Sequence, residues 1–215
     1  RTLTTNMSAW SRRRSAVEPH GDRWVVWDQR ANQEIWDIPD SYTLTEFLGQ
    51  GSYGSVVRGR CGALDVAVKR VGDAMCSLAH GLRTLREIAI LKRLDHPNVL
   101  RIVDVHPTVE DGLLTDIYIM FEFGGVDLSY ALKRETFTAD DVRAVLHQLL
   151  LALRYLHDSL VTHRDIKPAN LLHTLSGNVK VTDFGLARAL EKTATKSCIQ
   201  TKAEVGTPAY MSPEV

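Results

Sequence analysis

Residues 163–170 read His163-Arg164-Asp165-Ile166-Lys167-Pro168-Ala169-Asn170, and Asp183-Phe184-Gly185 follows a short distance along the chain. Asp165 can orient a hydroxyl group and accept its proton, and Lys167 can neutralise charge on a moving phosphate. Asn170 and Asp183 offer hard oxygen ligands to magnesium. This combination of residue types favours phosphoryl transfer from ATP to a hydroxyl group.

The composition is that of an ordinary soluble protein. The chain has 215 residues, of which 44% are hydrophobic, and its 26 Lys and Arg residues balance its 26 Asp and Glu residues. This balance argues against a role in coating nucleic acid or a membrane surface. The three cysteines lack metal-binding spacing, and no signal peptide or membrane-spanning run is visible. We therefore expect a monomer with reduced thiols in the cytoplasm, the nucleus or both.

The first part of the chain divides into a tail and a strand-forming extension. Residues 1–20 are polar and without periodicity, which predicts a flexible tail. Residues 24–38 carry apolar side chains around a polar centre, which predicts a hairpin or short strands packed on a neighbour. A WW module is the alternative, since Pro39 follows Trp36, but the earlier tryptophan of such a module is missing.

The remaining pattern predicts a strand-rich half followed by a helical half. Residues 44–71 alternate as strands do, and further strands are expected at 100–106 and 117–123. Residues 82–94 have a helical pattern, with Leu85, Ile88 and Leu91 expected to face inward. A long helix should begin near Thr138, where Asp141 can complete a capping box.

A Gly-x-Gly-x-x-Gly run, Gly49-Gln50-Gly51-Ser52-Tyr53-Gly54, precedes the strand that contains Val56. Glycines let the backbone approach phosphate oxygens, although the run also occurs in dinucleotide-binding folds and ordinary turns. Here a strand rather than a helix should follow it, unlike in a nicotinamide site. Lys69 ends the apolar stretch Val66-Ala67-Val68. Such a lysine is usually an edge residue of a strand, but beside a glycine-rich turn we interpret it as a ligand of the α- and β-phosphates.

Glu87, on the predicted helix, can supply the counter-charge for Lys69. A partly shielded pair at about 4 Å is worth roughly 4 kcal/mol of Coulomb attraction before desolvation. The position of the helix could therefore control activity. Without the other motifs, Glu87 would be interpreted as a solvated helical glutamate.

Taken together, these motifs resemble those of eukaryotic protein kinases, in the order and spacing of that family. The resemblance covers residues 42–215 and includes Ser212-Pro213-Glu214. It implies an α+β, two-lobed fold with Mg²⁺ and ATP in the cleft, comprising an N-lobe at 42–123 and a partial C-lobe at 124–215. Residues 21–41 would form an extension packed on the N-lobe. Lys167 resembles the serine/threonine version of the catalytic loop.

Four segments, at residues 35–42, 83–88, 94–99 and 121–128, resemble the MAP kinase and cyclin-dependent kinase branch. By this resemblance Phe121 is the gatekeeper, the backbone at Glu122 and Gly124 binds adenine, and Asp127 faces the ribose. The other expected nucleotide contacts are Leu48, Gly49, Gln50, Gly51, Ser52, Tyr53 and Gly54 in the glycine-rich stretch, and Val56, Ala67 and Leu172 around the adenine ring.

Three arginines, Arg86, Arg164 and Arg188, match positions that in this branch converge on a phosphorylated activation segment. Clustered guanidinium groups suit a phosphate, although ordinary surface ion pairs are the alternative. We therefore expect phosphorylation by an upstream kinase between Ala189 and Val205. The candidates are Thr193, Thr195, Ser197 and Thr201, with Thr201 best placed.

The chain departs from MAP kinases where their Thr-x-Tyr pair should align, near residues 202–204. Residues 205–214 also lack the Trp-Tyr-Arg run of proline-directed kinases. The resemblance therefore implies neither MAP-kinase-type activation nor a preference for proline after the target residue. Thr207 should still hydrogen-bond near Asp165 and Lys167.

The expected function is a signalling protein serine/threonine kinase that acts on a protein substrate. The alternative is a nucleotide-binding scaffold or pseudokinase. In kinases most of the helical lobe lies beyond the Ser-Pro-Glu motif, so we expect the 215-residue piece alone to be poorly soluble or inactive.

Overall fold

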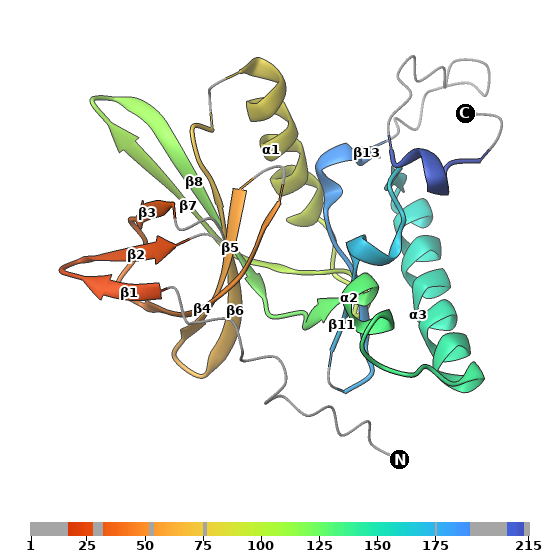
Figure 1. The fold of residues 1–215 in the computed structure, drawn as a ribbon. Coiled ribbons are helices and arrows are strands. Elements are labelled where there is room, and N and C mark those ends of the chain that lie inside the picture. Colours follow the sequence, from red (N-terminus) through yellow and green to blue (C-terminus); the bar gives the residue numbers. More distant parts are fainter. Residues whose placement is uncertain are drawn as a thin grey trace. The chain divides into compact units, whose positions relative to one another are not determined.

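The computed structural model describes residues 17–27, 32–51, 54–74, 77–174, 176–189 and 206–212. The chain forms two compact units, which we name by their content. The sheet unit comprises the described residues up to Thr84, together with Ile102–Phe123. The helical unit comprises Leu85–Arg101 and the described residues from Gly124 onward. The strand-rich unit and the helix-containing unit confirm the expected α+β class (Figure 1).

A five-stranded antiparallel sheet, in the order β4-β5-β6-β8-β7, forms the centre of the sheet unit. Its strands are β4 (Tyr42–Gly51), β5 (Gly54–Cys61), β6 (Leu64–Val71), β7 (Ile102–Glu110) and β8 (Leu113–Glu122). The last two strands are longer than their sequence pattern predicts. Asp111 and Gly112 both adopt positive φ, 50° and 79°, and connect them as one hairpin. An Asp-Gly pair is a strong signal for such a turn.

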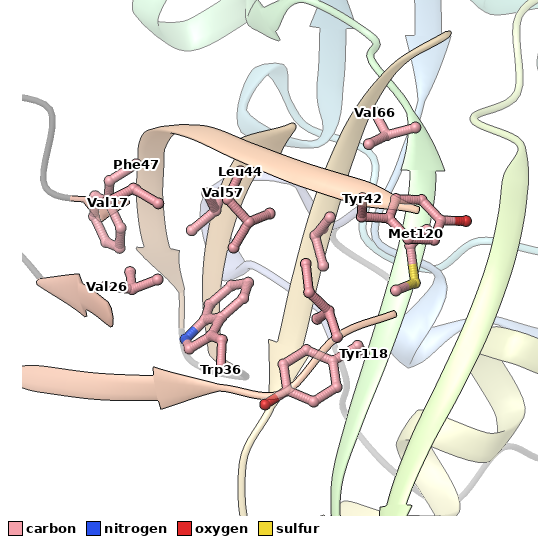
Figure 2. Packing of buried hydrophobic residues seen from close by; sticks show 12 residues of the cluster. Val17, Val26, Trp36, Tyr42, Leu44, Phe47, Val57, Val66, Tyr118 and Met120 are labelled. Carbon is pink, nitrogen blue, oxygen red and sulfur yellow. The ribbon is translucent and has the colours of Figure 1, made fainter. Parts of the chain in front are cut away.

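A second, three-stranded antiparallel sheet precedes it, formed by β1 (Val17–His20), β2 (Arg23–Trp27) and β3 (Gln33–Trp36). Its apolar side chains join one buried cluster with those of the five-stranded sheet, as Figure 2 shows. Trp36 is fully buried, and its ring centroid lies 5.6 Å from that of Tyr118. WW modules bind proline-rich peptides in open, aromatic-lined grooves. A buried Trp36 cannot line such a groove, so the structure does not support the WW interpretation.

Helix α1 (Leu78–Leu91) corrects part of our prediction. Leu85 was expected to face inward, but 53% of its surface is exposed, whereas Leu91 is buried. The inward face instead carries Thr84, Glu87 and Leu91, all buried. These positions keep a helical spacing, and Leu85 lies one residue, about 100°, around the helix from that face. The helix also begins earlier than predicted, where the Ser77 hydroxyl accepts a hydrogen bond from the backbone N–H of His80.

In the helical unit, α3 (Ala139–Asp158) begins with the predicted capping box. The Asp141 N–H donates to the Thr138 hydroxyl, and the Thr138 N–H donates to the Asp141 carboxylate. Helix α2 (Leu128–Leu132) precedes it. The short strands are β9 (Val126–Asp127), β11 (Leu171–His173) and β12 (Val179–Val181) in one sheet, and β10 (Val161–Thr162) paired with β13 (Arg188–Ala189). Within the described residues, no helix combines the length and apolar character needed to cross a bilayer.

Candidate active site

Asp165 lies at the centre of a polar cluster in the helical unit. The residue is 8% exposed, and its carboxylate accepts hydrogen bonds from Lys167 Nζ at 2.8 Å, Thr207 Oγ1 at 2.7 Å and Asn170 Nδ2 at 2.9 Å. Lys167 Nζ also donates to Thr207 Oγ1 at 2.7 Å. The expected contact of Thr207 with Asp165 and Lys167 is thus confirmed. These contacts hold the carboxylate, the ammonium group and the hydroxyl in one orientation.

The same contacts keep Asp165 ionised. Burial by itself would raise the pKa of the Asp165 carboxyl, but hydrogen bonds from Lys167, Thr207 and Asn170 outweigh it and lower the pKa. The side chain is therefore an anion at neutral pH. An anionic carboxylate on a rigid loop can accept a proton or a hydrogen bond from a hydroxyl group.

His163 contacts the backbone of the loop that carries Asp165. It is 2% exposed, its Nδ1 accepts the Asp165 N–H at 3.2 Å, and its Nε2 lies 2.9 Å from the carbonyl of Thr182. Since Nδ1 accepts, Nε2 carries the proton and donates to Thr182. The ring also packs edge-on against Phe184, with centroids 4.8 Å apart. The neutral imidazole thereby ties the Asp165 loop to the Asp183-Phe184-Gly185 segment.

The pH dependence of stability should reflect this burial. Burial lowers the pKa of His163, so the unfolded chain binds a proton below about pH 6.5 that the folded chain does not. The free energy of unfolding should therefore fall with decreasing pH in that range, by at most about 1.4 kcal/mol per pH unit for this group. His96, whose pKa burial also lowers, adds a contribution of the same sign.

Denaturant unfolding of the full-length gene product at pH 7.5, 6.5 and 5.5 would measure the effect. A His163→Gln variant should lose part of the slope, while a His20→Gln variant, at an exposed position of β1, should keep it. Equal slopes in wild type and His163→Gln would contradict the neutral, buried imidazole.

Asn170 and Asp183 are the residues expected to bind magnesium. Nδ2 of Asn170 donates to both the backbone carbonyl and the carboxylate of Asp165, so these two hydrogen bonds do not use Oδ1, the atom that would bind a metal. Asp183 adopts a left-handed conformation with φ 62° and ψ 71°, and its side chain does not cap the short 3-10 turn that follows. Among the described residues, no cluster of three or more His, Cys, Asp or Glu side chains forms a dedicated metal site. Two oxygen ligands fit Mg²⁺, which keeps several waters or substrate oxygens.

The three arginines gather in the helical unit. Arg164 Nε donates to the carbonyl of Leu186 at 2.7 Å, and β10–β13 pairing places Thr162 opposite Arg188. Burial lowers the pKa of Arg164, and the positive charges of Arg188 and Arg86 lower it further. Like charges this close repel one another unless an anion joins them. Thr201, together with Thr193, Thr195 and Ser197, lies outside the described residues.

One face of the five-stranded sheet collects the residues expected to contact a nucleotide. Val56 pairs with Lys69, and Ala67 pairs with Phe121, across neighbouring strands. Paired residues lie on the same face of a sheet, and residues two apart along a strand share it too. Val56, Ala67, Lys69 and Phe121 therefore lie on one face, opposite the buried Val57, Val66 and Val68.

The glycine-rich stretch joins β4 to β5. Gly49 pairs with Val56 and Gly51 with Gly54, while Leu48 and Gln50 lie on β4. A side chain at Gly54 would place Cβ 1.8 Å from the carbonyl oxygen of Arg70, and its φ is 135°. Only glycine fits there. Ser52 and Tyr53 lie outside the described residues.

The chain after β8 approaches β11 closely. A Cβ at Gly124 would lie 2.6 Å from a methyl group of Leu172, and one at Gly125 would lie 2.1 Å from the carbonyl oxygen of His173. Asp127 Oδ1 accepts the N–H of Tyr130 and so caps α2. This contact uses one carboxylate oxygen of Asp127, and the expected contact of the other with a ribose stays a prediction. Glu122 pairs with Val66 on β6.

Glu87 is only 5% exposed, which sets it apart from a solvated helical glutamate. It belongs to the helical unit and Lys69 to the sheet unit. Their pairing stays a prediction.

Asn98 and Gln148, for which the sequence predicted no role, hydrogen-bond the backbone of β12. Asn98 Nδ2 donates to the carbonyl of Val179 at 2.8 Å and to Gln148 Oε1 at 2.9 Å. Gln148 Oε1 also accepts the Val179 N–H. A buried Asn in a turn and a Gln inside an apolar helix face are the signals that could have indicated them.

Comparison with known proteins identifies the class. Residues 42–215 match the family model described as the protein kinase domain, so the chain belongs to the protein kinase family. Within it the chain is MAP kinase-like. It is 34% identical over 199 residues to mitogen-activated protein kinase 14 of Xenopus laevis, which covers 89% of this chain and 52% of the relative. The chain thus spans about half the length of that relative.

Proposed function

We propose that the protein is a serine/threonine kinase that transfers the γ-phosphate of Mg-ATP to a protein hydroxyl. The cluster around Asp165 carries this proposal. Asp165 orients the acceptor hydroxyl and takes its proton, because it is an anion held by three donors. Lys167 neutralises charge on the transferred phosphate, and Thr207 keeps both side chains in place. Lys167 also supports serine/threonine rather than tyrosine specificity.

We assign magnesium and ATP to the residues that the sequence predicts for them. Asn170 and Asp183 supply oxygen ligands to Mg²⁺, which would neutralise phosphate charge. Lys69, held by Glu87, contacts the α- and β-phosphates, and the glycine-rich stretch covers them. The adenine ring lies against Val56, Ala67 and Leu172, beside the gatekeeper Phe121.

Regulation would work through the arginine cluster. A phosphate on the segment between Ala189 and Val205, with Thr201 best placed, would relieve the repulsion among Arg164, Arg188 and Arg86 by bidentate hydrogen bonds. An upstream kinase would add it. We propose a monomer in the cytoplasm or nucleus, acting on protein substrates and not on nucleic acid or membranes, with the kinase domain at 42–215.

Phosphate mapping of the active full-length gene product by mass spectrometry should find a modified residue in 189–205. Removing it with a phosphatase should lower turnover by at least about tenfold, which is 1.4 kcal/mol. Arg188→Gln, at an exposed position, should lower turnover to the same level without phosphatase.

The control is Arg93→Gln, which removes another exposed arginine of the helical unit and should leave turnover unchanged. An active protein with no phosphate in that segment would contradict the regulatory proposal while leaving the catalytic one intact.

The direct test of the catalytic proposal is transfer from labelled ATP to a protein acceptor, followed by identification of the labelled residue. Phosphoserine or phosphothreonine is expected. Binding of ATP without any transfer would favour a scaffold.

A further inference from the structure

A polar cavity of about 300 Å³ lies in the sheet unit, on the side of the sheet opposite Lys69. Ser55 and Arg70, which line it, pair across β5 and β6. Successive residues of a strand point to opposite faces, so Ser55 and Arg70 point away from Val56 and Lys69. The cavity therefore lies on the other face of the sheet from Val56 and Lys69, although its lining includes Gly54 of the glycine-rich stretch. Its lining also includes Glu34 from β3 and His80 from the first turn of α1.

The charges around the cavity are mainly negative. Arg70 is engaged by two carboxylates: Nη1 lies 3.2 Å from Glu34 Oε2, and Nη2 lies 2.8 Å from Asp116 Oδ2. Asp73 adds a third carboxylate, exposed to solvent at the rim. Three carboxylates against one guanidinium leave a surplus of two negative charges. Such a site disfavours anions and attracts cations.

Glu34 already accepts from two neighbours besides Arg70. Its Oε1 accepts from the Ser55 hydroxyl at 2.9 Å, and its Oε2 accepts from the Trp36 indole N–H at 2.8 Å. These contacts fix the wall of the cavity. They leave the Asp73 carboxylate as the acidic group with room for a ligand.

His80 provides the second, independent indication of a ligand. His80 is partly buried, and its Nε2 is covered from solvent and has no hydrogen-bond partner among the described residues. Buried polar atoms in proteins are nearly always satisfied, so an unpartnered one at a cavity wall indicates a missing donor or acceptor. As a neutral imidazole protonated on Nδ1, His80 would accept a hydrogen bond from a ligand N–H.

We propose that this cavity binds an organic cation, an ammonium or guanidinium group that donates to Asp73 and to His80 Nε2. The volume accommodates one such group and not a folded segment. The group can come from a small amine or from a Lys or Arg side chain of a partner protein. A bound cation would join β3, the start of β5 at Gly54 and the first turn of α1, because all three line the cavity.

The test is calorimetric titration of the full-length gene product with agmatine and with the peptide acetyl-Gly-Arg-Gly-amide. At least one of the two cations should bind. Binding of agmatine indicates a small amine as the ligand. Binding of the peptide alone indicates a side chain of a partner. Both results support the cation site.

Variants locate the binding. Asp73→Asn should weaken it at least tenfold, whereas Asp111→Asn should not, although Asp73 and Asp111 share exposure and a left-handed backbone, with φ 46° and 50°. Gly72→Leu should abolish binding by filling the cavity. A Cβ at Gly72 meets only ordinary contacts, 3.6 Å from Asp116 and 3.7 Å from Arg70, so the backbone can keep its conformation.

Thermal melting of each variant shows whether it is folded. The proposal is overturned if neither cation binds the wild type, or if folded Asp73→Asn and Gly72→Leu variants bind like the wild type.

Discussion

An Asp165→Asn variant should lose about 10²- to 10⁴-fold in turnover, the contribution typical of a positioned general base. Asparagine has the same shape but no charge, so it cannot take the hydroxyl proton. It also presents an amide N–H₂ group where Asp165 accepts from three donors, Lys167, Thr207 and Asn170. In at least one of these contacts, two hydrogen-bond donors would then face each other. Single-turnover transfer from Mg-ATP to a protein acceptor measures the loss.

The control for this variant is the affinity for Mg-ATP, because the proposed role of Asp165 concerns the acceptor hydroxyl. Nucleotide affinity should stay close to that of the wild type, and a cooperative melting transition should remain, lowered by the lost hydrogen bond. Wild-type turnover in folded Asp165→Asn would contradict the assignment of Asp165. Loss of nucleotide affinity together with turnover would move Asp165 from catalysis to nucleotide binding.

The second large effect is expected from Asp183→Asn. The carboxylate is the anionic ligand of the proposed magnesium site, and its loss should cost several kcal/mol of transition-state stabilisation. A loss of about 3 kcal/mol corresponds to more than a hundredfold in turnover. The backbone should tolerate the change, since asparagine also adopts the left-handed conformation seen at this position, φ 62°. Turnover measured over a range of Mg²⁺ concentrations reports the effect.

Raised Mg²⁺ should restore part of the activity of Asp183→Asn, because a weakened site fills at higher concentration. Asp111→Asn offers a matched control, as it removes a carboxylate from another left-handed position, on the exposed turn between β7 and β8. It should not change the Mg²⁺ requirement. An Asp183→Asn variant with unchanged turnover and unchanged Mg²⁺ dependence would refute the metal assignment.

The catalytic loop could be predicted from sequence because its chemistry depends on residue types at close spacing. Asp165, Lys167 and Asn170 lie within one loop, so their proximity needs no knowledge of the fold. The contact with Thr207 required the family resemblance, because Thr207 is far along the chain. The role of His163 was not predicted. Its two ring contacts link segments whose approach depends on tertiary packing.

Local patterns predicted the start of α3, but not the ends of α1, β7 and β8 or the inward face of α1. The Thr138 capping box involves neighbours in sequence, and the structure has it as expected. The inward face of α1 was misassigned because hydrophobicity alone placed Leu85 inside. The buried face contains the polar Thr84 and Glu87, which a hydrophobic pattern cannot identify. The predicted tail at residues 1–20 was wrong at its end, because residues 17–20 form β1 and pair with β2. This pairing depends on a register that the sequence pattern of β1 does not specify.

Transfer of labelled γ-phosphate by the full-length gene product, with and without Mg²⁺, tests the central claim most directly. The account predicts labelled phosphoserine or phosphothreonine in a protein acceptor with Mg²⁺ present, and none without it or with Asp165→Asn. A folded, nucleotide-binding protein that transfers no phosphate under any of these conditions would contradict it.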